Sequence, residues 1–199
     1  ERFEPAMLGL VDEHAYRVQL GASGDDRRSQ IAGEFSRDGK TVIIEPSRFA
    51  LDGSQVLLED VHLQYGGARL SAQGSLNTEG ELSSDALVLQ IADFVLPLPE
   101  NDAARNTVKS VPVVLSTRIE ASGKLSIWQL KATGTLVRGK ERAGFDVAGS
   151  GTDSALDLPK MKVSMAQVGL DGWLRLRWQP AMDSAFEGKL IQFDPAYFF

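Results

Sequence analysis

Side chains that could perform catalysis or bind a metal are few in this chain of 199 residues, and they are widely spaced. The only two histidines, His14 and His62, lack a further His, Cys or carboxylate at the short fixed spacing that a metal site requires. A Gly-x-Ser-x-Gly nucleophile elbow, a phosphate-binding glycine loop and a His-Glu-x-x-His motif are all missing from the sequence. We therefore expect a protein that is not an enzyme, with no catalytic residues, no metal and no cofactor.

Adjacent acidic residues occur at Asp12-Glu13, Asp25-Asp26 and Glu59-Asp60. A general acid and a general base must converge on one substrate, whereas neighbouring side chains on a strand point to opposite faces. We interpret these pairs as residues of solvated turns.

Three tryptophans, Trp128, Trp173 and Trp178, could stack against sugar rings in a carbohydrate-binding module. However, Trp178 alternates with Leu174 and Leu176, so it belongs to the apolar side of a strand. This position favours burial or lipid contact over a sugar platform.

An alternation of apolar and polar residues with a period of two runs through the whole chain and indicates β-strands. Clear examples cover residues 16–20, 113–121, 128–136 and 172–178. Shorter runs at residues 41–45 and 49–51 are predicted as separate segments. Glycine, at 19 residues, separates many of these runs, and no segment of 12 or more residues has the spacing of an amphipathic helix. The sequence predicts an all-β fold in which strands add successively to a long, curved, amphipathic sheet.

Residues 97–112 interrupt the alternation, beginning with the turn-rich sequence Pro97-Leu98-Pro99-Glu100-Asn101-Asp102. We predict a first β module at residues 1–96, a loop or joint at 97–112 and a second β module at 113–199. One continuous curved sheet is the alternative arrangement.

The composition narrows the classes of partner. Lys and Arg number 21 against 27 Asp and Glu, a net charge of -6 without a basic cluster, which argues against nucleic-acid binding. The absence of cysteine excludes thiol catalysis, disulfides and cysteine-ligated metals, and it fits either the cytosol or an oxidising compartment.

No apolar run reaches the length of a membrane span. The chain starts at Glu1, and we expect it to be part of a longer protein whose anchor or targeting segment lies outside it.

The most specific pattern lies near the C-terminus. Residues 172–181 form the run Gly-Trp-Leu-Arg-Leu-Arg-Trp-Gln-Pro-Ala, and Phe193-Asp194-Pro195 follows about a dozen residues later. This pattern resembles the TamB family, in which a strand that ends in Trp-x-Pro is followed by a second strand and an Asp-Pro element. The Trp-x-Pro residues here are Trp178, Gln179 and Pro180. TamB proteins are periplasmic AsmA-like proteins of Gram-negative bacteria, and the match covers about thirty residues.

This resemblance implies an extended β-taco whose concave apolar groove carries phospholipid acyl chains or assists the assembly and translocation of outer-membrane proteins. It implies a periplasmic protein, anchored in the inner membrane and reaching the outer membrane. The implied partners are phospholipid or outer-membrane protein strands as cargo, and a TamA-like outer-membrane barrel.

Under this hypothesis the groove acts passively, and acyl chains slide along its apolar wall while headgroups stay in water. The residues that we predict to line it alternate on one face of each strand: Val18, Leu20, Ile31, Phe35, Leu63, Leu70, Leu89, Ile91, Leu115, Ile119, Leu130, Leu136, Val163, Leu174, Leu176 and Trp178. Two other functions remain open. One is an adhesive or carbohydrate-binding β-sandwich of a larger surface protein, and the other is a chaperone that binds outer-membrane strands at a free sheet edge.

Overall fold

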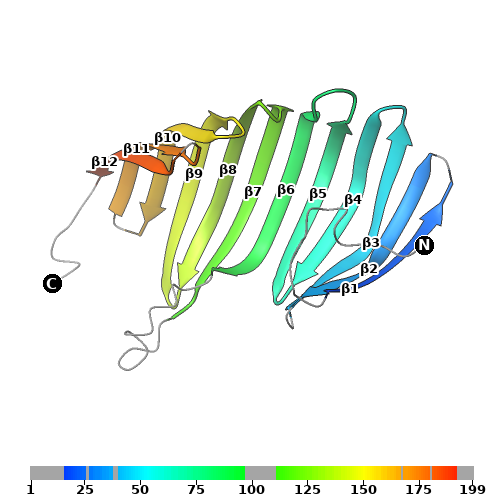
Figure 1. The fold of residues 1–199 in the computed structure, drawn as a ribbon. Coiled ribbons are helices and arrows are strands. Elements are labelled where there is room, and N and C mark those ends of the chain that lie inside the picture. The colour runs from blue at the N-terminus through cyan, green and yellow to red at the C-terminus, as the bar shows by residue number, and fades with distance from the viewer. Residues whose placement is uncertain are drawn as a thin grey trace.

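Twelve strands follow one another along the chain in the computed structural model (Figure 1), which describes residues 16–25, 27–37, 40–96, 111–166, 168–179 and 181–191. The strands are β1 (Tyr16–Gly24), β2 (Arg28–Arg37), β3 (Lys40–Asp52), β4 (Gln55–Tyr65), β5 (Ala68–Asn77), β6 (Ser83–Leu96), β7 (Val113–Lys124), β8 (Ile127–Arg138), β9 (Glu141–Gly151), β10 (Ala155–Met165), β11 (Val168–Arg177) and β12 (Asp183–Ile191).

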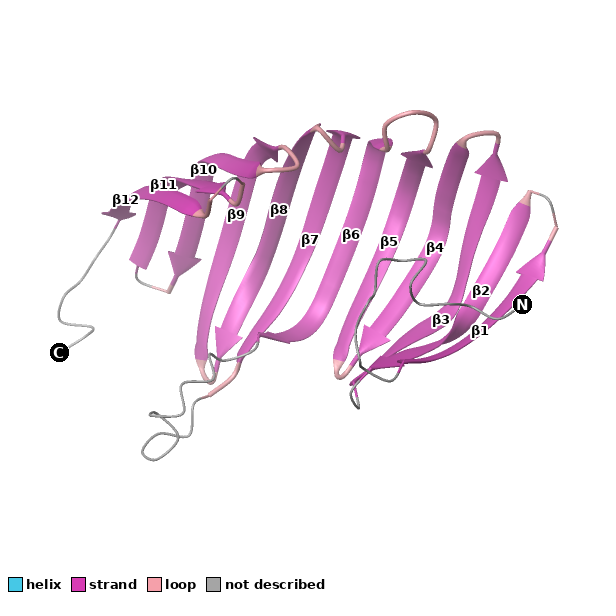
Figure 2. Ribbon diagram, in the orientation of Figure 1, coloured by secondary structure: helices cyan, strands magenta, loops and turns pink. Residues whose placement is uncertain are grey.

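All twelve strands belong to a single antiparallel sheet, and their order in the sheet is their order in the chain. The described part of the chain contains no helix and no second sheet (Figure 2). The sheet is curved and stays open, because β1 and β12 do not pair with each other. The prediction of an all-β fold with an extended, curved sheet is confirmed.

Strands β6 and β7 flank the segment that the sequence predicts as a loop or joint. Ten registered residue pairs, from Ser83 opposite Lys124 to Leu96 opposite Val113, join these two strands directly. Residues 97–110 lie outside the described part of the chain. The first and second halves therefore share one sheet, and their division into separate folding modules stays a prediction.

Bulges interrupt several strands and bend them. In β4, β6 and β10 the register shifts between Leu58 and Val61, between Ile91 and Phe94, and between Leu158 and Met161. At each bulge two successive residues lie on the polar face, while the residues that flank them lie on the apolar face. The extra residue lengthens the strand on its polar side, so the strand bends toward its apolar side.

The bulge in β3 explains why this strand is longer than expected. Residues 41–45 and 49–51 are two parts of one strand, Lys40–Asp52, and Pro46 lies in the irregular stretch between them. Proline lacks the N–H that a ladder needs, so a bulge is one of the few places where a strand tolerates it. The hydroxyl of the fully buried Ser47 accepts a hydrogen bond from the His62 N–H at 2.9 Å and donates one to the Glu45 carbonyl at 2.8 Å.

Candidate functional site

An uninterrupted row of uncharged residues crosses all twelve strands on one side of the sheet. Paired residues of antiparallel strands lie on the same face, so the row can be followed from strand to strand through the register. Its members, in order, are Leu20, Gly33, Ile44, Leu63, Leu70, Ile91, Thr117, Gly134, Phe145, Val163, Leu170 and Leu190. Thr117 is the single residue in the row with a hydrogen-bonding side chain, and its hydroxyl donates to the Thr133 carbonyl at 3.0 Å.

Parallel rows widen this surface, which we call the apolar face. One row runs from Val61 through Ala72, Leu89, Ile119, Ala132, Val147, Met161 and Gly172 to Gly188. A second runs from Phe49 through Leu58, Gly74, Leu87, Ala121 and Leu130 to Gly149. With strands about 4.8 Å apart and residues about 3.3 Å apart along each strand, the face measures roughly 50 Å by 25 Å.

Fifteen of the sixteen predicted groove residues lie on the apolar face. They are Val18, Leu20, Ile31, Phe35, Leu63, Leu70, Leu89, Ile91, Leu115, Ile119, Leu130, Leu136, Val163, Leu174 and Leu176. The sixteenth, Trp178, follows the end of β11, and its indole N–H donates to the Asp153 carbonyl at 2.7 Å. The structure thus brings fifteen of the predicted residues onto one continuous surface.

Strands β3, β9 and β12 also contribute to this face, although no residue in them was predicted to line the groove. Ile44, Phe145 and Leu190 are members of the twelve-strand row, and none was predicted. A period-two signal is present in β9, where Ala143, Phe145 and Val147 alternate with polar or small residues. In β3 the bulge breaks the period.

Within the described part of the chain, no second layer covers the apolar face. Among the described residues only four apolar side chains are buried, and three of them are alanines: Ala68, Ala72, Ala132 and Leu158. Near the ends of the sheet, Leu20 is 59% exposed and Phe186 is 54% exposed. A sheet with one apolar face normally buries it against a second layer, and no described element supplies such a layer here.

Aromatic rings on this face pack over glycines in the neighbouring strand. A Cβ added at Gly134 would lie 2.6 Å from Cζ of Phe145, and one added at Gly151 would collide with the ring of Trp128. The indole N–H of Trp128 donates to the Thr152 carbonyl at 3.3 Å, which fixes the ring beside the turn after β9. The glycines therefore allow large rings to lie flat against the sheet.

The opposite side, which we call the polar face, carries most of the charged residues of the strands. A row parallel to the twelve-strand row contains His62, Ser71, Gln90, Arg118, Thr133, Asp146, Lys162, Asp171 and Lys189. Ion pairs on this face join Arg118 to Glu120 at 3.1 Å and Arg175 to Asp157 at 3.2 Å. The two faces differ sharply in polarity, and water solvates the charged one.

The carboxylates of the described residues form individual ion pairs and hydrogen bonds rather than a cluster. Asp60 accepts from Nε2 of His62 at 2.6 Å and from Arg48 at 3.2 Å, and the hydrogen bond from His62 is the main cause that lowers the pKa of Asp60. No group of three or more His, Cys, Asp or Glu residues that could hold a metal ion occurs among the described residues. His14, like Asp12 and Glu13, lies outside them.

One expectation about the acidic pairs is wrong. Glu59 and Asp60 were predicted to lie in a solvated turn and to point apart, but they occupy the bulge within strand β4 and both lie on the polar face. Glu59 pairs with Arg28 at 3.4 Å, and Asp60 pairs with Arg48. The bulge breaks the alternation, and each carboxylate has its own cationic partner.

Hollows on the polar face lie between bulges. One hollow of about 500 Å³ lies between residues 85–86 of β6 and residues 159–160 of β10, and Glu120, Gln129 and Lys131 line it. Its walls combine both signs of charge with small apolar side chains. This mixture specifies no particular ligand.

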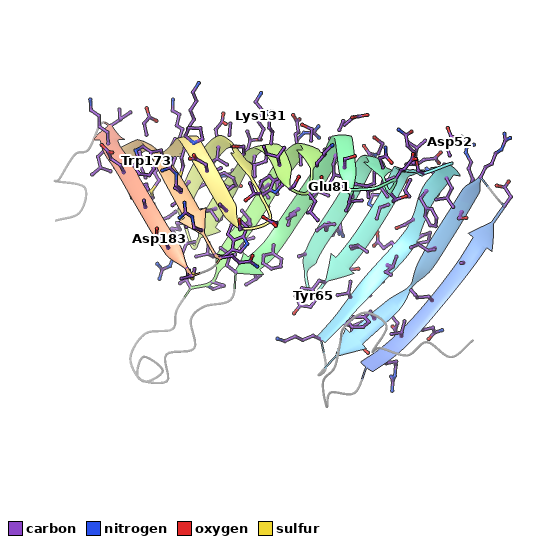
Figure 3. The ribbon with its side chains drawn as sticks, turned by 45° about the horizontal axis from the view of Figure 1, so that its top comes forward. Asp52, Tyr65, Glu81, Lys131, Trp173 and Asp183 are labelled. Carbon is purple, nitrogen blue, oxygen red and sulfur yellow. The ribbon has the colours of Figure 1, made fainter. Side chains whose placement is uncertain are left out.

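The three tryptophans do not form one platform. Trp128 lies on the apolar face and Trp178 follows β11, whereas Trp173 lies on the polar face, where its indole N–H donates to Glu187 at 3.1 Å. The guanidinium of Arg175 lies 5.9 Å from the centre of the Trp173 ring. Figure 3 shows Trp173 near one end of the sheet, far from the strands that carry Tyr65 and Asp52.

Within the described residues no helix is long and apolar enough to cross a membrane. Comparison with family models, curated proteins and solved structures found no match to this chain.

Proposed function

We propose that this chain is a periplasmic segment of a TamB-like protein and that its apolar face carries the acyl chains of phospholipids between the inner and outer membranes. One observation carries the proposal: a row of twelve uncharged residues crosses every strand of an open sheet, and no described element covers it. A surface of this kind binds by burial of apolar area, so the function needs no catalytic group.

The size of the apolar face supports a hydrophobic ligand. The largest apolar patch of a typical soluble monomer covers about 300–600 Å², and larger exposed patches mark binding sites for proteins, membranes or ligands. The dimensions given above correspond to roughly 1,200 Å² on the same strand spacings. Acyl chains would replace the missing second layer, and each buried methylene contributes about 0.8 kcal/mol.

The resemblance to the TamB family supports the location and partners that we propose. Most of the matching run, from Gly172 to Arg177, forms the second half of β11, and its leucines lie on the apolar face. Asp194 and Pro195 lie outside the described residues. As a TamB-like segment, the chain would belong to a protein anchored in the inner membrane and would act with a TamA-like barrel in the outer membrane.

The proposal is tested by replacing one residue on the apolar face and its neighbour on the polar face. Leu130 lies between Ala121 and Gly149, whereas Gln129 lies between Ser122 and Ser150 on the other side of the same strand. We expect protein purified without detergent to retain phospholipid, detected by native mass spectrometry and by thin-layer chromatography of extracts. The variant Leu130→Asp should lose most of this lipid, and Gln129→Asp should retain it. Equal lipid content in both folded variants would contradict the proposal.

A second candidate function is strand addition to a free edge. Within the described residues β1 pairs only with β2, and β12 pairs only with β11, so each has one side without a partner strand. Backbone groups on such an edge can bind an extended segment of an outer-membrane protein. Binding of a peptide by this route should be weakened by a proline in β12, for example Lys189→Pro. Leu130→Asp should leave this binding unchanged.

The carbohydrate-binding alternative has less support. A sandwich needs two packed sheets, and the described strands form one. The tryptophans that would stack against sugars lie on different sides of this sheet.

A further inference from the structure

The few charged positions on the apolar face all lie at one end of its strands. Among the side chains that the structure describes, they are Lys40 at the start of β3, and Arg138 and Glu141, which lie opposite each other on β8 and β9. At the other end of the strands the last residues of the face are uncharged: Leu51, Val56, Leu76, Gly123, Trp128, Gly151, Leu176 and Ser184. The apolar face therefore has a charged end and an uncharged end.

The turns at the two ends also differ in charge. We call the end that contains the β2–β3, β4–β5 and β8–β9 turns the basic rim. Among the described residues it carries five basic side chains and one acidic side chain: Lys40, Arg69, Arg138, Lys140, Arg142 and Glu141. The opposite end, the acidic rim, carries six acidic and four basic side chains: Asp25, Asp52, Glu79, Glu81, Asp153, Asp183, Arg27, Arg28, Lys124 and Arg177. Figure 3 shows Tyr65 at the end of β4 on the basic rim, and Asp52 at the end of β3 on the acidic rim.

Two carboxylates of the acidic rim are held in their charged form. The backbone N–H groups of Arg28 and Arg27 donate to Asp25 at 2.8 and 2.9 Å and lower its pKa. Hydrogen bonds from Ser126 lower the pKa of Glu81. This rim would repel a phosphate, whereas the basic rim would attract one.

We propose that phospholipids lie on the apolar face in one orientation, with the phosphate at the basic rim near Arg138 and Lys140 and the acyl chains directed along the strands toward the acidic rim. This inference rests on the proposed function, because it assumes that the face binds acyl chains. It adds the class of headgroup, a phosphate-bearing one, and the direction of the bound lipid.

The length of the strands fits this orientation. The acyl chains of one leaflet span about 15 Å, half of the hydrocarbon thickness of a bilayer. Along β8, the eight residue steps from Arg138 to Leu130 span about 26 Å at about 3.3 Å per step. A lipid with its phosphate at Arg138 would therefore cover Leu136, Gly134 and Ala132 and end before the Trp128 ring.

A pair of variants on neighbouring strands of the basic rim separates headgroup binding from general charge effects. Arg138 belongs to the apolar face, whereas Arg142 is opposite Val137 on the polar face. Binding of a short-chain phosphatidylglycerol and of a diacylglycerol with the same chains would be measured by isothermal titration calorimetry. We expect Arg138→Glu to weaken phosphatidylglycerol binding roughly fivefold, an effect of one partly exposed charge-assisted contact, and to leave diacylglycerol binding unchanged. Arg142→Glu should change neither.

The outcomes distinguish this inference from the proposed function. An equal loss for both lipids in Arg138→Glu, no loss for either, or the same loss in Arg142→Glu would overturn the orientation and leave acyl-chain binding intact. If the unmodified protein binds neither lipid, the proposed function itself fails. Circular dichroism of each variant identifies any loss of the sheet.

Mapping with photoreactive phospholipids provides a second measurement that needs no variant. A diazirine on the headgroup should crosslink near Arg138 and Lys140, and a diazirine at the chain end should crosslink to the apolar face between Ala132 and Leu130. Reversed or identical crosslink maps would overturn the orientation. Crosslinks confined to the polar face would contradict acyl-chain binding.

Discussion

Replacing Leu130 with Asp tests whether the apolar face is open in solution. The half-buried Leu130 side chain has small neighbours in its row, Ala121 and Gly149, so the protein loses only part of the roughly 1.5–3 kcal/mol that full burial of a leucine contributes. The poor β-propensity of aspartate adds up to about 1 kcal/mol. The sum is a destabilisation of about 2 kcal/mol, because the new carboxylate stays in contact with water.

A covered face would respond differently. Burial of a charge beneath a second layer of protein would cost more than about 4 kcal/mol or prevent folding. The assay is urea unfolding of delipidated protein, followed by circular dichroism, with Gln129→Asp as the matched control on the polar face. The control should lose no more than about 1 kcal/mol. A loss above about 4 kcal/mol in Leu130→Asp, with a normally stable control, would refute an open face.

Three further substitutions probe other parts of the account. Asp60→Asn should make the stability of the protein depend less on pH in the acid range. The hydrogen bond from His62 lowers the pKa of Asp60, so this carboxyl stabilises the fold above its ordinary pKa and loses the contribution as the pH falls through the lowered value. Midpoints of urea unfolding between pH 2 and pH 5 measure this loss. Gly151→Ala should destabilise the sheet by about 1–3 kcal/mol, since the new Cβ collides with the Trp128 ring, and near-ultraviolet circular dichroism should report the displaced indole. Leu158→Ala should cost about 2–4 kcal/mol in urea unfolding, because this side chain is among the few that are buried.

Each of these substitutions has a control in the same sheet. Gly67→Ala adds a methyl group with nothing within 4 Å and should be nearly neutral, so equal losses at positions 67 and 151 would contradict the packing argument. Leu190, 54% exposed on β12, should tolerate alanine with a loss below about 1 kcal/mol. A wild-type acid limb in Asp60→Asn would show that the hydrogen bond from His62 does not affect stability.

The sequence predicted the two-faced character of the sheet well, because alternation along a strand depends on local spacing alone. Fifteen of the residues chosen from that alternation share one face. The alternation fails at bulges, where two successive residues lie on one side. For this reason the sequence shows only the short runs 41–45 and 49–51 where the structure has one strand, and Glu59 and Asp60 were assigned to opposite faces.

The absence of a second layer from the described residues could not be predicted from the sequence. A strand that packs in a sandwich and a strand that lines an open surface have the same alternation, since both place apolar residues on one side. The order of the strands decides between them, and it depends on pairing between segments. The charge difference between the two rims was not predicted either, since it also depends on the pairing of the strands. Lys40 and Arg138 lie at the same end of the sheet only when all the hairpins between them have formed.

The most direct test of the central claim compares two adjacent positions on opposite faces. The chain has no cysteine, so Ile91→Cys on the twelve-strand row and Gln90→Cys on the polar face can each be labelled at a single site with an environment-sensitive dye such as acrylodan. On addition of phosphatidylglycerol, emission from position 91 should move to shorter wavelength as acyl chains cover it, and emission from position 90 should not change. No shift at position 91, or equal shifts at both positions, would contradict an apolar face that holds lipid.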